Sequence, residues 1–241
     1  LGDVYKRQVL QKALDITLPR FPTYKVAIRK GLFWRYLEPN NRPGPFVTPD
    51  IKNPCMPMPF KANNRYLLRI YYYGKRISLE AHHCLGDGTG GMCVLQTLTA
   101  VYLGLLGHSV TPSGFVLDIN DSPDTEELED AYMRYANARV RPPRPGEKTY
   151  RVRGTKEPFY TLNIIDGIMS VKEVMAVARK YDATLTEYLN AVLLYALLQK
   201  QEHDMPFRFR PVKIAMPVNL RRFFPSKTLR NFITCLLYTS P

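Results

Sequence analysis

The stretch from His82 to Gly91, HHCLGDGTGG, constrains the fold more than any other part of the chain. The run before it, RISLEAHH, alternates apolar and polar residues as a half-buried strand does. The run after it, residues 92–106, is apolar enough for a buried helix. Four glycines lie between them, Gly86, Gly88, Gly90 and Gly91. Glycines allow a sharp turn and leave room for a ligand. The stretch therefore predicts a strand, a turn and a helix that together present a site.

His83 is the predicted general base of this site, and His82 and Asp87 are the other candidate catalytic residues. In an extended strand it shares a face with Ile77, Leu79 and Ala81, whereas His82 points to the other face. An imidazole on an apolar face is partly desolvated, which favours the neutral form near pH 7. Because only the neutral form accepts a proton, this placement suits acid-base chemistry.

Other interpretations of the stretch stay open. Asp87 or Thr89 could simply cap the following helix by accepting hydrogen bonds from its free amides. The two histidines could be structural residues with satisfied hydrogen bonds. Together with Cys84 and Cys93 they could also bind a metal, but neighbouring strand residues face opposite ways and no zinc-like spacing occurs. We therefore expect no metal.

The seven residues HHCLGDG, His82 to Gly88, resemble the HHxxxDG motif of the chloramphenicol-acetyltransferase-like superfamily. That superfamily includes alcohol acyltransferases, wax ester synthases and the condensation domains of nonribosomal peptide synthetases. The surrounding runs YYYGKRISLEAHHCLGDGTGG and LQTLTAVYLGLLG are similar to the alcohol O-acetyltransferase branch. The resemblance covers about residues 9–234 and implies an α/β fold, a two-subdomain chloramphenicol-acetyltransferase-like sandwich whose second subdomain is truncated in this chain.

The same resemblance implies a partner for Asp87. In the superfamily an arginine ends a strand shortly before an Asn-aromatic pair, and Arg221 and Asn231-Phe232 match these positions. That arginine is understood to pair with the motif aspartate, which would make Asp87 and Arg221 a buried ion pair clamping the loop of His83. Arg222 as the partner, or a basic surface patch, are the alternatives.

The implied reaction is acyl transfer from acetyl-CoA or another acyl-CoA to a small alcohol, with His83 taking the alcohol proton and no covalent acyl-enzyme. Thr89 and the backbone amides from Gly88 to Gly91 are the candidate oxyanion donors. Acyl-CoA is then a co-substrate, its binding residues are unknown, and no cofactor is bound permanently. A condensation-type reaction of a carrier-protein thioester with an amine is one alternative, and a non-catalytic binding relative is another.

Both ends of the chain carry residues that we interpret as translated DNA adaptor. One DNA segment read in opposite orientations encodes both DVYKRQ and CLLYTS. We therefore expect an internal piece of a longer protein, and, because the family's substrate tunnel runs between two subdomains, we expect this piece alone to be inactive. Its expected parts are an adaptor-derived start at 1–8, an N-terminal subdomain at 9–140, a basic proline-rich linker at 141–158, the incomplete start of a C-terminal subdomain at 159–234, and an adaptor-derived end at 235–241.

Much of the net charge of +13 lies in residues 134–156, where Glu147 is the only acid. Its prolines favour a solvated linker, and attraction of a polyanionic substrate such as coenzyme A is compatible with that interpretation. A nucleic-acid arm is the third interpretation, and we expect no nucleic-acid partner. No apolar run has membrane-spanning length, and the cysteines form no paired pattern. These features predict a cytoplasmic enzyme without disulfides or a membrane span.

Periodicity and turn residues also predict the secondary structure. The expected helices are 9–18, 92–106, 126–137, 171–181 and 187–201, the last capped by Thr186, and the expected strands are 24–29, 32–37, 67–73, 76–83, 159–165 and 212–218.

Overall fold

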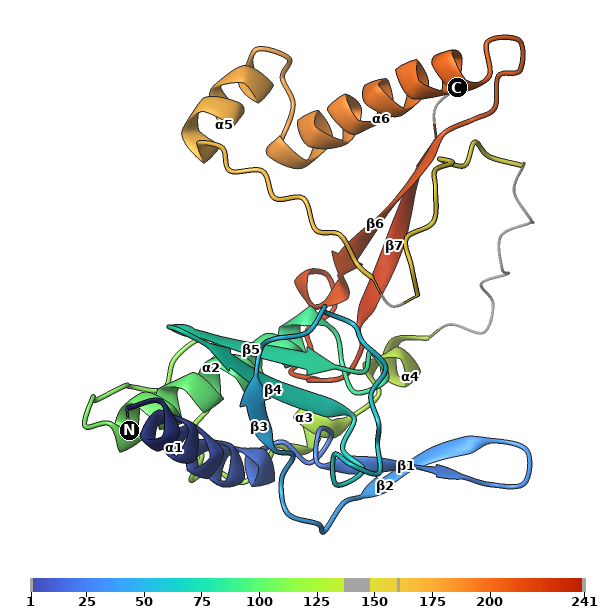
Figure 1. Ribbon diagram of the computed structural model, residues 1–241. Helices are drawn as coiled ribbons and strands as arrows, with labels where there is room; N and C mark the ends of the chain where they lie inside the picture. The colour runs from blue at the N-terminus through green and yellow to red at the C-terminus, as the bar shows by residue number, and fades with distance from the viewer. Residues whose placement is uncertain (1, 137–147, 160, 240–241) are drawn as a thin grey trace. The chain divides into compact units, whose positions relative to one another are not determined.

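The computed structural model describes residues 2–136, 148–159 and 161–239. The chain is mixed α/β with small sheets, and it divides into two compact units. The first unit comprises residues 1–136 and 219–233, and the second comprises residues 137–218 and 234–241. Residues 219–233, which the resemblance assigned to the segment 159–234, thus group with the first unit (Figure 1).

The main sheet of the first unit has the order β3-β4-β5, with strands Val47–Pro49, Leu68–Tyr73 and Arg76–Ala81. β3 runs parallel to β4, and β4 and β5 form an antiparallel hairpin in which Ile70 faces Leu79. The hairpin turns at Gly74, whose φ of +54° lies in the left-handed region that glycine adopts without a steric penalty. The predicted hairpin over 67–83 is confirmed, but its second strand ends earlier.

β5 ends at Ala81 because the chain turns immediately after it. The amide of His82 still donates to the carbonyl of Leu67, at 2.8 Å, and the amide of Leu85 then donates back to the carbonyl of His82, at 3.0 Å. Leu85 is buried in the core, so the turn is held by packing as well as by its hydrogen bond. The prediction that His83 continues the strand is therefore wrong.

A second hairpin consists of β1, Val26–Lys30, and β2, Arg35–Pro39. The strands are antiparallel with Ile28 opposite Leu37, and the amide of Gly31 donates to the carbonyl of Trp34 across the turn, at 2.8 Å. The hairpin predicted over 24–37 is confirmed, with a later start for both strands.

Two long helices cover the main sheet. α1, Gly2–Thr17, contacts α2 and β3, and α2, Gly88–Leu105, contacts β5 (Figure 1). α1 places Leu10, Ala13 and Leu14 in the core at the i, i+3, i+4 spacing of one helix face. The helix predicted from residue 9 thus begins at Gly2 and includes residues that we interpreted as adaptor.

The single helix predicted over 126–137 is two short ones, α3, Thr125–Leu128, and α4, Ala131–Tyr135. The break occurs at Glu129 and Asp130, whose backbones are extended, and the Asp130 carboxylate caps α4 by accepting from the amide of Tyr132. A short acidic side chain favours such a cap over a helix interior, which explains the interruption.

Residues 219–233 attach to α3 and to the loop that follows it. The amide of Leu229 donates to the carbonyl of Glu127, at 2.9 Å, and the Thr228 hydroxyl donates to the carbonyl of Glu129, at 2.7 Å. The Glu127 carboxylate in turn binds the guanidinium of Arg20 through two hydrogen bonds of 2.6 and 2.9 Å. A buried, bidentate ion pair thus anchors the element on which residues 219–233 lie.

The second unit contains α5, Val171–Arg179, and α6, Leu185–Asp204, which contact each other. α6 is capped by Thr184 and not by Thr186: the Thr184 hydroxyl accepts from the amide of Glu187, while the Glu187 carboxylate accepts from the amide of Thr184. This reciprocal capping box satisfies two free amides at once, whereas Thr186 lies inside the first turn.

β6, Lys213–Asn219, pairs with β7, Ile233–Thr239, and the short 3-10 helix η2, Leu220–Arg222, follows β6. The strand predicted over 159–165 is wrong for the residues described there, which have no regular structure and leave Ile164 and Ile165 exposed. Alternation alone does not form a strand when no partner strand lies beside it.

Two expectations concern the chain as a whole. Of the predicted linker at 141–158, residues 141–147 lie outside the described residues, and 148–158 contain no helix or strand. In the described part of the chain, no helix combines the length and the apolar character needed to cross a membrane.

Candidate active site

The loop between β5 and α2, residues 82–87, has one exposed part and one buried part. His82, His83 and Cys84 are exposed, whereas Leu85 and Asp87 are buried. The loop is thus anchored at its second half, next to the start of α2, and displays its first half.

Asp87 anchors the loop through four hydrogen bonds. Its Oδ1 accepts from the amides of Thr89, at 3.0 Å, and Gly90, at 3.3 Å, which caps α2. Its Oδ2 accepts from Arg221 Nη1, at 2.7 Å, and from the amide of Phe232, at 3.0 Å. The helix cap and the ion pair, which the sequence left as alternatives for Asp87, are therefore both present.

Arg221 is as fully bonded as its partner. Its Nε and Nη2 donate to the carbonyl of Thr228, at 3.0 and 2.7 Å, and Nη2 also donates to the carbonyl of Arg230, at 2.6 Å. Nη1 donates to Asp87 and to Asn219 Oδ1, the latter at 3.2 Å. Every N–H of the guanidinium thus has a partner, so the buried charge is both paired and hydrogen-bonded.

The predicted ion pair of Asp87 with Arg221 is confirmed, and the alternative partner Arg222 is exposed. The roles of these residues in chemistry stay predictions.

Gly86 and Gly90 are needed because other groups approach their backbone closely. A Cβ atom on Gly86 would lie 2.4 Å from both the Leu229 carbonyl oxygen and the Tyr24 hydroxyl, and on Gly90 it would lie 2.1 and 2.5 Å from them. Burial, together with the nearby Asp87 charge, raises the pKa of Tyr24, so this hydroxyl stays protonated. The two glycines therefore serve close packing and not a positive φ, which neither has.

Gly88 and Gly91 differ from the other two glycines of the loop. A Cβ atom on either would meet nothing within 4 Å, and Gly88 is exposed. These positions leave open space beside the first turn of α2, as expected for a ligand site.

The two histidines are placed differently from the expectation. His83 lies beyond the end of β5 and is exposed, so the expected desolvation of its imidazole on an apolar face is wrong. Asn231 Nδ2 donates to the carbonyl of His83 at 2.8 Å and fixes its backbone. His82 Nδ1 accepts from the amide of Cys84 at 3.3 Å, which places the proton of a neutral His82 ring on Nε2.

The position of Cys93 argues against a metal site formed by the two histidines, Cys84 and Cys93. This residue is only 5% exposed and belongs to the core, whereas His82, His83 and Cys84 are exposed, so the four do not form one ligand set. Burial raises the pKa of Cys93 to about 11, so its thiol is neutral. The described residues hold no group of three or more His, Cys, Asp or Glu that could bind a metal ion.

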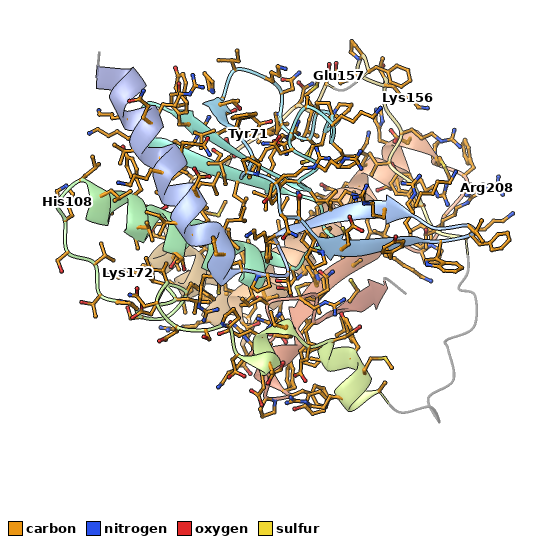
Figure 2. All side chains as sticks on the ribbon, turned by 90° about the horizontal axis from the view of Figure 1, so that it is seen from below. Tyr71, His108, Lys156, Glu157, Lys172 and Arg208 are labelled. Atoms are coloured by element: carbon orange, nitrogen blue, oxygen red, sulfur yellow. The ribbon has the colours of Figure 1, made fainter. Side chains whose placement is uncertain are left out.

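The remaining histidines lie on other parts of the chain. His108 is exposed on the loop that follows α2 (Figure 2). His203 is exposed near the end of α6, 3.4 Å from Asp204, as expected for a solvated residue near a helix end.

Three residues that shape the site were not predicted from the sequence. Tyr24 and Leu229 pack on the glycines, and Asn219 Nδ2 donates to Thr89 Oγ1 at 3.2 Å. Only Asn219 carries a sequence signal, because it precedes Arg221 by two residues and an Asn at that position can cap the short helix η2.

No family model and no curated protein sequence matches the chain. Several solved structures are similar to it. Polyketide synthase associated protein 5 from Mycobacterium tuberculosis has 17% identity and a TM-score of 0.57, over 97% of this chain and 60% of that chain. TRI101 from F. sporotrichioides, in complex with coenzyme A and T-2, has 12% identity and a TM-score of 0.50, over 97% and 60% of the two chains.

The first condensation domain of the calcium-dependent antibiotic synthetase, in complex with a substrate analogue, has 15% identity and a TM-score of 0.51, over 96% of this chain and 59% of that domain. At these identities the likeness shows a shared fold. The chain spans about 60% of the length of the solved structures that it matches.

Proposed function

We propose that this chain forms part of an acyltransferase that moves an acyl group from a thioester to a hydroxyl group, with His83 as the general base. The main support is the bonding of Asp87. Since both of its oxygens are occupied by four other donors, Asp87 serves to hold the loop and leaves the imidazole of His83 free for substrate. Asn231 adds a second hold on the backbone of His83.

The proposed reaction has two steps. The hydroxyl oxygen of the acceptor attacks the thioester carbonyl carbon while His83 removes the hydroxyl proton, which gives a tetrahedral oxyanion and an imidazolium. The carbonyl then re-forms, the carbon–sulfur bond breaks, and the imidazolium returns the proton to the departing thiolate. The products are an ester and a free thiol, and His83 is neutral again.

We further propose acyl-CoA as the thioester and a small alcohol as the acceptor. A polyanionic donor suits a chain with a net charge of +13, since opposite charge raises its local concentration. The shared fold includes a protein whose structure contains coenzyme A and also a condensation domain. The second candidate is therefore a condensation reaction, in which an amine attacks a thioester carried by a protein.

The experiment measures thiol release by a purified protein that contains this chain. Acetyl-CoA with small alcohols tests the first candidate, and an acyl carrier protein with an amine tests the second. His83→Ala should lower kcat by about a hundred- to ten-thousand-fold, the usual contribution of a positioned general base. His82→Ala is the matched control: it should keep most of kcat and lose stability, because His82 Nδ1 supports the amide of Cys84.

Near-normal turnover in His83→Ala, or a large kcat loss confined to His82→Ala, would contradict the assignment of the base. Thiol release that is equal in the wild type and in buffer, with both classes of thioester, would favour the non-catalytic binding relative.

A further inference from the structure

We infer that Asn219 is a positioning residue of the proposed active site, which orients the Thr89 hydroxyl so that it donates a hydrogen bond to the oxyanion. The inference rests on the proposed function, because the oxyanion forms only when a thioester carbonyl is attacked. It concerns how that charge is stabilised, which the identity of the base leaves open.

The first turn of α2 has fewer free amides than its sequence suggests. The amides of Thr89 and Gly90 donate to Asp87 Oδ1, at 3.0 and 3.3 Å, and the amide of Gly91 donates to the Asp87 carbonyl, at 3.0 Å. Of the four amides from Gly88 to Gly91, only that of Gly88 has no acceptor among the described residues. A tetrahedral oxyanion is stabilised best by more than one donor, and within residues 88–91 the further donor is the hydroxyl group of Thr89.

The orientation of the Thr89 hydroxyl is fixed by a chain of hydrogen bonds that runs from Arg221 through Asn219 to Thr89. The backbone amide and Nη1 of Arg221 donate to Asn219 Oδ1, at 3.1 and 3.2 Å. Because these groups can only donate, they identify that atom of Asn219 as the oxygen and turn Nδ2 toward Thr89.

Asn219 Nδ2 lies 3.2 Å from Thr89 Oγ1 and can only donate to it. The hydroxyl oxygen is thereby used as an acceptor, and its own proton is left for another group. Within the described part of the chain, that proton has no acceptor. The relay from Arg221 through Asn219 thus leaves Thr89 as a donor.

The surroundings of Thr89 suit an anionic oxygen. Thr89 and Gly88 lie in the first turn of α2, an 18-residue helix whose N-terminal end carries partial positive charge. Nothing lies within 4 Å of a Cβ atom placed on Gly88 or Gly91, so a carbonyl group has room beside the hydroxyl. Thr89 is half-buried, which strengthens its hydrogen bonds relative to those in bulk water.

The decisive variant is Asn219→Asp. It keeps the size of the side chain and the acceptor for Arg221, but it replaces the Nδ2 donor with a carboxylate oxygen. That oxygen accepts the Thr89 proton and withdraws it from the substrate. We expect kcat to fall about 10²- to 10³-fold, the usual effect of losing one oxyanion donor, with KM nearly unchanged and the melting temperature unchanged or higher.

Two variants of Thr89 serve as controls. Thr89→Val removes the hydroxyl at constant shape and should lower kcat by the same factor, whereas Thr89→Ser keeps the hydroxyl and should stay within a few-fold of wild type. Thr89→Val combined with Asn219→Asp should be no slower than either single variant, because both changes remove the same donor. The side-chain amide resonance of Asn219 should shift in Thr89→Val and stay in place in Thr89→Ser.

Any one of three results would overturn the inference. The first is a kcat of Asn219→Asp near the wild-type value, and the second is a double variant in which the two losses of kcat multiply. The third is an NMR resonance of the Asn219 side-chain amide that Thr89→Val leaves unchanged. His83→Ala separates this failure from that of the proposed function. If His83→Ala abolishes turnover while Asn219→Asp does not, only the role of Asn219 is wrong. If wild type releases no thiol, or His83→Ala keeps full turnover, the proposed function is wrong and the inference falls with it.

Discussion

Asp87 Oδ2 and Arg221 Nη1 are 2.7 Å apart, although the two residues are separated by 134 positions in the sequence. Their side chains are 3% and 11% exposed. Asp87 also accepts from backbone amides in the first turn of α2 and from the amide of Phe232. Arg221 also donates to backbone carbonyls of its own segment. The pair therefore joins the start of α2 to residues 219–233. The structure of the loop that carries His83 therefore depends on a segment far along the chain.

Asp87→Ala should lower the free energy of unfolding by about 3–5 kcal/mol, because it leaves the buried Arg221 charge without its anionic partner. Asp87→Ala combined with Arg221→Met should recover part of that loss, since no unpaired charge remains. Urea unfolding of the two single variants and the double variant gives the coupling energy. Strictly additive losses would show that the two residues do not interact.

The exposed ion pair of Asp50 with Arg76 provides the control for this cycle. Its side chains are 22% and 63% exposed, with a contact of 2.8 Å, which is close to that of the buried pair. Asp50→Ala should lower the free energy of unfolding by less than about 1 kcal/mol, because water screens and replaces the contact.

Gly90→Ala should lower the free energy of unfolding and Gly91→Ala should raise it, although the residues are neighbours in the first turn of α2. A methyl group on Gly90 would lie 2.1 Å from the Leu229 carbonyl oxygen, so the backbone has to move, at a cost of about 1–3 kcal/mol. A methyl group on Gly91 meets nothing and should stabilise the helix by up to about 1 kcal/mol. Thermal unfolding measures both, and equal effects would contradict the close approach of Leu229.

The buried thiol of Cys93 should make stability fall at high pH. Burial raises its pKa from 9.0 to about 11, so between these values the thiol ionises in the unfolded chain and stays neutral in the folded one. The stabilisation from the neutral thiol is complete below pH 9 and is lost as the pH rises to 11, and it amounts to a few kcal/mol at most, on the order of two pKa units. The raised pKa of Tyr24 acts in the same direction at still higher pH.

Unfolding free energies at pH 8 and pH 10.5 test this expectation. The difference between the two should shrink in Cys93→Ala and stay unchanged in Cys55→Ser, which alters an exposed thiol. An unchanged difference in Cys93→Ala would show that Cys93 does not carry the effect.

The sequence predicted the features that depend on local pattern. The hairpin of β4 and β5 follows from alternation and the turn at Gly74, and α2 follows from an apolar run with Asp87 at its cap. The ion pair came from the resemblance, because no local pattern connects Asp87 to a residue so distant in the sequence.

Features set by tertiary contacts could not be predicted in this way. The strand ends at Ala81 and not at His83 because Leu85 turns into the core, and periodicity carries no information about that turn. The need for glycine at position 86 comes from Leu229 and Tyr24, which approach from other segments. The alternation at 159–165 gave no strand, since a strand requires a partner that the pattern does not specify.

α6 displays several exposed apolar side chains. Val192 and Tyr195 are 48% and 63% exposed, and Leu189 and Leu193 are exposed beside them on the same helix. A contiguous apolar surface of this kind binds hydrophobic dyes. Val192→Lys should therefore reduce dye fluorescence while changing the free energy of unfolding by no more than about 0.5 kcal/mol, as expected for an exposed position.

Lys200→Ala is the matched control, because it changes an exposed charged residue of the same helix and should leave dye binding unaltered. Leu14→Ala gives the opposite case: it opens a cavity in the core of the first unit and should cost about 2–5 kcal/mol. If Val192→Lys destabilised the protein as strongly as Leu14→Ala, this face of α6 would be packed in solution, and the dye would have to bind elsewhere.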